Sequence, residues 1–209
     1  STQKDSLKTL SYVKFPVYIG ALGYRVCFVS AQVKDKFAAA SSLRDLQKFT
    51  HGQGVGWVDS AVLKHNQLRV FEFEGAPRLI RMTANNEVHT FCRGITEIKE
   101  EVDENQNVPG IYVDQSIALF YPHLRFFFTH SSNKKLIERL ELGLKLAYED
   151  GSLLRLFMED YYESLAFVDM HSRRIISMEN PFLGELDFDY SKYILNFNQM
   201  QETGMQKEN

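Results

Sequence analysis

The feature that most constrains this fold is a regular alternation of strand-like and helix-like segments between residues 24 and 102. Short runs rich in β-branched and aromatic residues predict strands at 24–30, 54–59, 68–73 and 88–94. Segments with helical periodicity or capping residues lie after them and predict helices at 41–49, 60–66, 76–83 and 95–102. Alternation at this spacing predicts an α/β fold with a parallel sheet covered by helices on both faces.

Capping residues mark several of the expected helix boundaries. Ser42 and Asp45 have the spacing of a helix start, Pro77 falls in a first turn, and Asp59 is expected to cap the helix at 60–66. The second half differs: residues 116–122 and 125–131 predict two dense apolar strands. A long helix follows between an Asn133 cap and a Gly151 stop, and Ser152 is expected to cap the next helix.

Charge and hydropathy exclude two classes of partner. The net charge is −3 and the sequence pI is about 6.1, which leaves no basic surface of the kind that binds nucleic acid. The apolar runs are far shorter than the ~20 residues of a membrane helix.

Cys27 and Cys92 are the only cysteines. Either they pair in an oxidising compartment or both are free buried thiols, and the free thiols are the interpretation favoured here.

The stretch from His51 to Ser60, HGQGVGWVDS, carries three glycines but fits no phosphate-binding template. No Lys follows the glycines as a Walker loop requires, and Trp57 stands where a dinucleotide-binding loop needs its third glycine. One interpretation is a tight strand-to-helix turn with Trp57 in the core. The other is a helix start whose free N–H groups receive a carboxylate or another small anion.

Metal binding and catalysis have no support in the sequence. The six histidines show no ligand spacing, and no nucleophile elbow is present. The acidic run at 97–105 is interpreted as the solvated face of a short helix. We therefore expect no cofactor, no metal and no enzymatic activity.

An ordered set of motifs resembles the bacterial extracellular solute-binding proteins of type II, the amino-acid ABC transporter receptors of the periplasm. The resemblance runs from Phe15 to Leu183, nearly the whole chain. It rests above all on the GVGWVD, RGITE and YEDGS blocks and on the flanking segments GALGYRVCFV, SLRDLQKF, IALFYP, RFFFTHS and RRIISMENPFL. The 84–94 segment departs from the family pattern, with Glu87, His89 and Cys92 where relatives tend to carry Arg, Asp and Pro.

The resemblance implies two α/β lobes that are joined by a two-stranded hinge and close on a small polar solute. On this interpretation residues 1–29 are a remnant of the first lobe with a hinge strand, and 30–121 form the second lobe. Residues 122–183 form the return hinge strand and the first lobe's C-terminal helices, and 184–209 form a polar tail. The first lobe is incomplete, so apolar helix faces are left uncovered, and we expect a homodimer.

The candidate binding residues lie near the expected hinge and strand ends. Arg93 is the expected partner of a ligand carboxylate because its planar fork holds two oxygens, although an ion pair with Glu97 is the structural alternative. Arg25 faces either the cleft or a carboxylate of the first lobe. Trp57 is a candidate for stacking on the solute and Asp59 for binding an ammonium group. The other candidates are Ser60, Glu97, Tyr24 and Tyr121.

The leading hypothesis is a solute-binding protein for an amino acid or similar small polar ligand, located in the periplasm and delivering its ligand to a membrane permease. The alternative is a degenerate relative that kept the fold and acts as a homodimeric interaction or sensory module. Nucleic acid is not expected as a partner of either.

Overall fold

The computed structural model describes residues 9–184 and 186–197. Its main feature is a seven-stranded sheet with the order β4-β3-β5-β2-β7-β9, in which β6 also pairs with β2. The strands are β2 (Tyr24–Ser30), β3 (Thr50–Gly54), β4 (Arg69–Phe73), β5 (Thr90–Gly94), β6 (Ile111–Val113), β7 (Ile117–Phe120) and β9 (Arg174–Ser177). The expected α/β architecture is confirmed.

Strand β2 runs against all of its neighbours in the sheet. It pairs antiparallel with β5, β6 and β7, whereas β3–β4, β3–β5 and β7–β9 are parallel. The strands other than β2 therefore share one direction, and the sheet is mainly parallel. The expected mainly parallel sheet is confirmed, and β2 is the strand that departs from the common direction.

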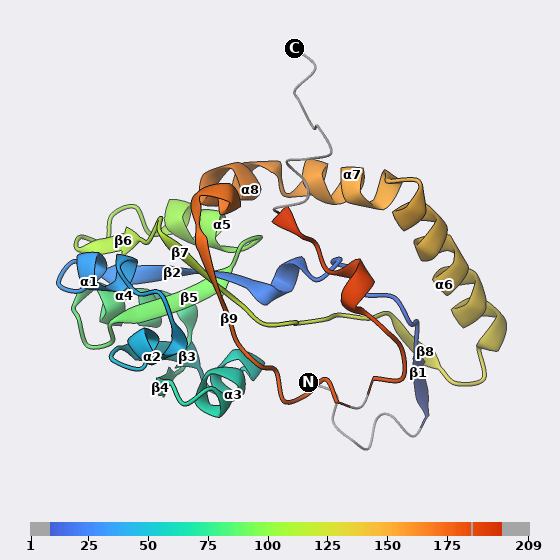
Figure 1. The fold of residues 1–209 in the computed structure, drawn as a ribbon, viewed down its shortest axis with the longest axis horizontal. Helices are drawn as coiled ribbons and strands as arrows, with labels where there is room; N and C mark the ends of the chain where they lie inside the picture. Colours follow the sequence, from blue (N-terminus) through green and yellow to red (C-terminus); the bar gives the residue numbers. More distant parts are fainter. Residues whose placement is uncertain (1–8, 185, 198–209) are drawn as a thin grey trace, which may run out of the picture.

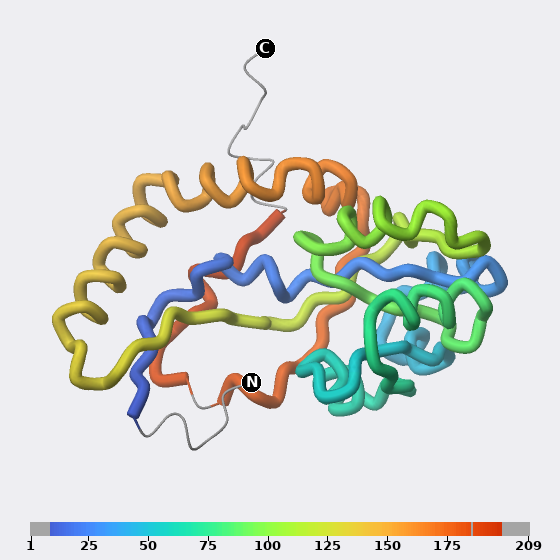
Figure 2. Tube along the Cα trace, turned by 180° about the vertical axis from the view of Figure 1, so that it is seen from behind, coloured from blue at the N-terminus to red at the C-terminus, as the bar shows by residue number. Residues whose placement is uncertain are grey.

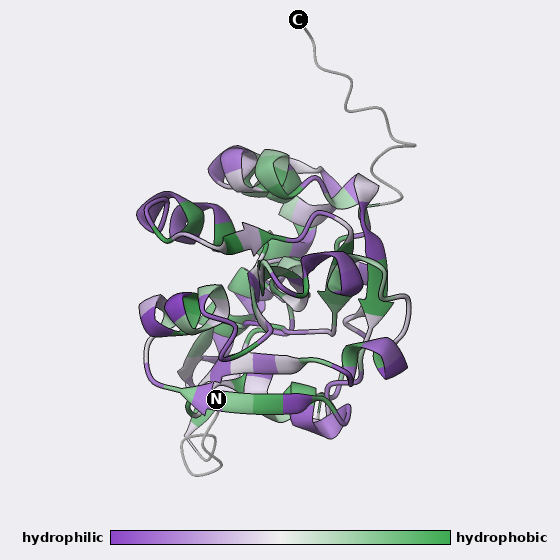
Figure 3. Cartoon of the chain, turned by 90° about the vertical axis from the view of Figure 1, so that its left-hand side faces the viewer, coloured by the Kyte–Doolittle hydropathy of each residue, from purple (hydrophilic) through white to green (hydrophobic). Residues whose placement is uncertain are grey.

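Helices cover both faces of this sheet (Figure 1). They are α1 (Lys34–Ala38), α2 (Leu43–Leu46), α3 (Val58–His65), α4 (Ala76–Ala84) and α5 (Ile98–Glu104). Because strand side chains alternate between faces, Val26 and Phe28 of β2 join one buried cluster and Cys27 and Val29 join the other. Figure 3 shows hydrophilic and hydrophobic residues together on the surrounding helices, as expected where only one side of a helix meets the core.

The second half of the chain forms an arch of helices and supplies one strand of a separate small sheet, whose other strand comes from residues 10–12. Strand β1 (Leu10–Tyr12) pairs antiparallel with β8 (Phe128–His130). The arch consists of α6 (Lys134–Glu149), α7 (Ser152–Asp160) and α8 (Tyr162–Val168). Figures 1 and 2 place α6 at the edge of the molecule far from the seven-stranded sheet. The chain then returns through β9, which lies within the 122–183 segment yet joins the main sheet beside β7.

Three short 3₁₀ turns complete the described structure, at Ala21–Gly23, Met170–Ser172 and Ser191–Tyr193. The last of these lies within 184–209, the segment expected to be a polar tail. Tyr193, Leu195 and Phe197 are buried, and the Leu195 N–H donates to the carbonyl of Ile19 at 2.7 Å. Aromatic and leucine side chains at alternating positions hold this segment on the core. Residues 198–209 lie outside the described part of the chain.

Cys27 and Cys92 form a disulfide, so the expectation of two free thiols is wrong. The two residues are directly paired across the antiparallel strands β2 and β5. Each is at most 2% exposed. The cysteines are 65 positions apart in the sequence, and only the unexpected antiparallel pairing brings them together.

Helix capping follows the sequence in part. The Ser42 hydroxyl accepts from the Asp45 N–H at 3.3 Å, as expected. Asn133 is the N-cap residue of α6, but its side chain donates to Thr129. Gly151, with φ of 76°, ends α6 and occupies the N-cap position of α7 that was expected for Ser152.

Candidate functional site at the ends of β3 and β5

The glycine-rich stretch forms a tight turn between β3 and α3. Strand β3 ends at Gly54, so the expected strand at 54–59 is wrong and those residues form the turn and the helix start. Gly56 has φ of 74°, a conformation that side chains disfavour. A Cβ at Gly54 would lie 2.2 Å from Cε2 of Trp57. The glycines therefore let the half-buried Trp57 ring lie directly over the end of the strand.

Asp59 does not cap α3, because the helix begins one residue before it and Trp57 occupies the N-cap position. Its carboxylate turns instead toward Arg25 on β2, which is 5% exposed. Asp59 Oδ1 lies 3.0 Å from Nη2 of Arg25 and also accepts from the Tyr121 hydroxyl. Arg25 Nε donates to the Tyr121 oxygen at 3.0 Å, and Nη2 lies 3.3 Å from Nδ1 of His123.

The electrostatics of this buried group favour the charged Arg25–Asp59 pair. Burial alone raises the pKa of Asp59, but the Arg25 charge and the Tyr121 hydrogen bond outweigh it and hold that pKa below its usual range. Burial lowers the pKa of Arg25, whereas Tyr121, Asp59 and Glu97 raise it, with a net rise. Burial and the Arg25 charge lower the pKa of His123 to about 4. His123 is therefore neutral at pH 7, and its Nδ1 can accept from Arg25.

Arg93, near the end of β5, lies beside this group with its charge already paired. Its guanidinium carbon is 4.7 Å from the centre of the Trp57 ring. Nη2 lies 3.0 Å from Glu97 Oε2, and Nε donates to Glu101 Oε1 at 2.6 Å. The Arg25 guanidinium approaches the same Glu97 oxygen at 4.0 Å. Glu97 thus connects the two arginines in one cluster.

The carboxylate side of this cluster has spare acceptor capacity. Burial raises the pKa of Glu101, although Arg93 opposes this effect. Among the described residues, the buried side-chain atoms without a hydrogen-bond partner are Glu97 Oε2, Glu101 Oε2 and Gln53 Oε1. Of these, Glu97 Oε2 is still ion-paired with Arg93, so Glu101 Oε2 is the carboxylate oxygen of the cluster that lacks a partner. Each of the three atoms is an oxygen that can only accept from a donor.

The structure brings most of the predicted binding residues into this arginine–carboxylate cluster: Arg25, Trp57, Asp59, Arg93, Glu97 and Tyr121. Two predicted residues lie outside it. The Ser60 hydroxyl donates to Glu72 Oε1 at 2.7 Å on β4, and the Tyr24 hydroxyl donates to the Leu195 carbonyl at 2.8 Å.

Sequence reasoning missed Glu101 and His123. Glu101 belongs to the acidic run interpreted as a solvated face, but its side chain is only 14% exposed. The spacing of four between Glu97 and Glu101 was the available signal, since residues four apart lie on one face of a helix and Glu97 was already considered as a partner of Arg93. His123 offered no such signal, because it lies in a segment without regular secondary structure.

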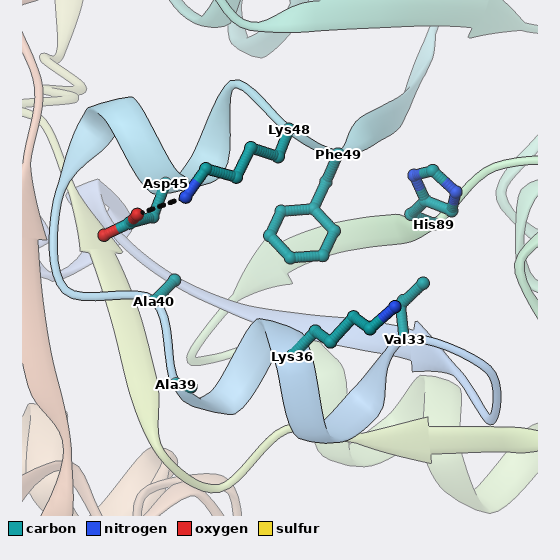
Figure 4. A pocket seen from close by; sticks show the side chains of 8 residues that line it. All are labelled: Val33, Lys36, Ala39, Ala40, Asp45, Lys48, Phe49 and His89. Carbon is teal, nitrogen blue, oxygen red and sulfur yellow. Dashed lines mark hydrogen bonds and ion pairs between the residues drawn. The ribbon is translucent and has the colours of Figure 1, made fainter.

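Two cavities lie beside the seven-stranded sheet, away from the arginine–carboxylate cluster. The first, of about 580 Å³, lies between α1, α2 and the start of β5, with Lys36, Lys48 and Asp45 around Phe49 and His89 (Figure 4). Lys48 is paired there with Asp45 at 2.7 Å. The second, of about 390 Å³, is lined mainly by apolar residues of α5, β6 and α8 with the amides of Asn105 and Gln115. Neither cavity includes a residue of the arginine–carboxylate cluster.

No described helix combines the length and the apolar character needed to cross a membrane. Within residues 9–184 and 186–197, no cluster of three or more His, Cys, Asp or Glu side chains could hold a metal ion.

Comparisons with known proteins identify the fold. No protein-family model and no curated protein matches the chain. Among solved structures, it is similar to the amino acid ABC transporter substrate-binding protein AbpA from Streptococcus pneumoniae bound to L-arginine, with a TM-score of 0.52 and 15% identity over 78% of this chain and 66% of that chain. It is also similar to the GluR0 ligand-binding core in complex with L-glutamate, with a TM-score of 0.53 and 11% identity over 77% and 68%.

The chain spans less than two thirds of the length of the Streptococcus pneumoniae protein. At these identities the likeness concerns the fold alone, and it agrees with the resemblance in the sequence. The chain has the α/β fold of the type II periplasmic binding proteins.

Proposed function

We propose that this protein binds an amino acid or a similar small polar solute, without catalysis, as a receptor for ABC-type transport. The observation that carries the proposal is the convergence of Arg25, Arg93, Trp57 and their carboxylate partners at one edge of the sheet. Strands β3 and β5 end at this edge, and in open α/β sheets ligands bind beside the carboxyl ends of the strands. The neighbours AbpA and GluR0 were solved with amino acids bound.

The charges of the cluster favour a ligand with a cationic group. Two guanidinium groups face the carboxylates of Asp59, Glu97 and Glu101, so one negative charge is left over when His123 is neutral. The Oε2 atom of Glu101 lacks a donor, which an ammonium or guanidinium group supplies, whereas Glu97 Oε2 is held by its ion pairs with Arg93 and Arg25. In this proposal the ligand's cation draws these carboxylates to itself, and Arg93 is released to hold the ligand carboxylate.

The proposed clamp divides the chain as the family resemblance implies. Residues 30–121 form the second lobe, while 1–29 and 122–183 contribute to the first lobe and the hinge. Trp57 then stacks on the solute from the second lobe. A periplasmic location is supported by the disulfide between Cys27 and Cys92, since such bonds persist in oxidising compartments. Delivery of the solute to a membrane permease completes the proposal.

The test is a calorimetric titration of the purified protein with single amino acids, including L-arginine, L-lysine, L-glutamine and L-glutamate. We expect heat with a cationic amino acid, and a loss of that heat in Arg93→Met and Glu101→Gln. Arg44→Met is the matched control, because Arg44 is exposed on α2 away from the cluster. Absence of heat with every amino acid contradicts the proposal, as does equal binding by the Arg93 variant.

A second candidate function, a homodimeric interaction or sensory module, is favoured by the surface of α6. No residue of this helix is buried, and Leu142 and Leu146 are 59% and 52% exposed. Contiguous exposed apolar side chains of this kind mark interaction surfaces. Light scattering of the purified protein tests this candidate, because a monomer at every concentration contradicts it.

A further inference from the structure

The outer side of α6 carries a seam of residues at the spacing used by paired helices. Lys135, Arg139, Leu142, Leu146 and Glu149 follow one another at intervals of four, three, four and three. This is the repeat of a coiled-coil contact line, which keeps one stripe of a helix facing a partner. Lys135, Arg139, Leu142, Leu146 and Glu149 are exposed along the whole line.

The middle of this seam is suited to close contact with another helix. Leu142 and Leu146 supply apolar side chains, and Leu136 beside the seam is 46% exposed. Gly143 lies between the two central leucines in sequence, and a Cβ there would meet no atom within 4 Å. A partner helix can therefore approach the backbone at this point without displacing any described residue.

The two ends of the seam carry opposite charges. Lys135 and Arg139 lie near the start of α6 and Glu149 at its end, followed by the exposed Asp150. A second α6 laid antiparallel brings the basic start of each helix against the acidic end of the other, and it also opposes the two helix dipoles. A parallel pair sets like charges side by side. The seam is thus complementary to itself in one orientation only.

Other pairings on α6 leave this seam free. Lys145 donates to Glu141 at 2.5 Å within the helix, so their charges are mutually satisfied on the flank. Ile137, Leu140, Leu144 and Tyr148 are half-buried against the protein's own core and define the opposite, inward side. Figures 1 and 2 both show α6 at the molecular edge, with no described element outside it.

We propose that two copies of this chain associate through an antiparallel, two-fold contact between their α6 helices. Leu142 lies at the centre of this contact, Leu146 packs beside Arg139 of the other copy, and Lys135 of each copy faces Glu149 of the other. The inference rests on the second candidate function and names the surface that it uses. It does not depend on whether the arginine–carboxylate cluster binds a solute.

The test uses reversed charges at the two ends of the seam, followed by sedimentation velocity over a range of concentrations. We expect the wild-type protein to dimerise, and Lys135→Glu and Glu149→Lys each to weaken dimerisation by about tenfold, because each creates two like-charge contacts in a two-fold dimer. An equal mixture of the two variants should form a heterodimer of wild-type strength, since both contacts between unlike variants are attractive again. Leu142→Glu should abolish dimerisation.

Lys134→Glu is the matched control. It makes the same charge change one residue away, on the side of the helix that the seam does not use, and it should leave the dimer intact. Thermal unfolding of each variant confirms that the fold is retained. A wild-type protein that stays monomeric overturns both this inference and the second candidate function. A dimer that the seam substitutions leave unchanged overturns only this contact, and the calorimetric titration tests solute binding separately.

Discussion

Removal of the disulfide should cost a large part of this protein's stability. The perturbation is the double variant Cys27→Ala/Cys92→Ala, which opens a covalent loop between residues 65 positions apart. A loop of that length corresponds to about 4 kcal/mol of lost conformational entropy in the unfolded chain. Typical net stabilities are about 5–15 kcal/mol, so this change is comparable to a substantial fraction of the total.

The position of the disulfide adds a second consequence. Both sulfurs are buried between β2 and β5, in the strand pair that carries Arg25 and Arg93. We therefore expect the folded protein to resist reduction by a thiol reagent at neutral pH and to become reducible only in denaturant. After reduction, strand β2 is held to β5 by hydrogen bonds and packing alone.

Urea unfolding followed by circular dichroism measures the effect. We expect the double variant to lose about 4 kcal/mol of unfolding free energy, and its melting temperature to fall by about 8–16 °C for a chain of this size. Wild-type protein unfolded and refolded under reducing conditions is the control, because it separates the loop effect from the lost packing of the sulfur atoms. A loss below about 1 kcal/mol, or two thiols that react with maleimide in the oxidised folded protein, contradicts the reasoning.

Three further predictions concern buried charges and the glycine turn. Arg25→Met should lower the unfolding free energy by about 3–5 kcal/mol, because it leaves Asp59 buried and unpaired. Adding Asp59→Asn should restore part of the loss in the same urea assay. An Arg25→Met variant as stable as the wild-type protein contradicts the pairing. Burial lowers the pKa of His51 to about 4, below its unfolded value of about 6.5. The free energy of unfolding should therefore be highest above pH 6.5 and fall by up to about 3 kcal/mol as the pH drops toward 4. Urea unfolding at a series of pH values measures this, and a free energy that stays constant over the range refutes it. Gly54→Ala should displace Trp57, the only tryptophan of the chain, and shift its fluorescence to longer wavelength, whereas an unchanged spectrum means that the turn has room for a methyl group.

The sequence predicted the alternation of strands and helices well because each element carries its own local signal. Strand residues 24–30, the Ser42 cap and the long helix from residue 134 follow from periodicity and capping chemistry. The direction of β2 could not be predicted in this way. Its partner β5 lies 65 positions further along the chain, and strand pairing at that distance depends on tertiary packing that local patterns do not encode.

The candidate site was predictable where residue type and position agreed. Arg25, Arg93 and Trp57 lie at strand ends and in a glycine turn, which are places where ligands bind. Glu101 was missed because an acidic run is usually solvated, and only the contact with Arg93 reveals its burial. The disulfide was missed for the same reason as the direction of β2, since the cysteines meet only when that strand pairs antiparallel with β5.

The most direct test of the central claim uses the indole N–H signal of Trp57, which is unambiguous because the chain has a single tryptophan. A ¹⁵N–¹H titration with the amino acid that gives heat in calorimetry should move this signal, with saturation at the calorimetric Kd. The Arg93→Met variant should leave the signal in place over the same range. Calorimetric binding that leaves the Trp57 signal unmoved would place the ligand elsewhere and contradict the account.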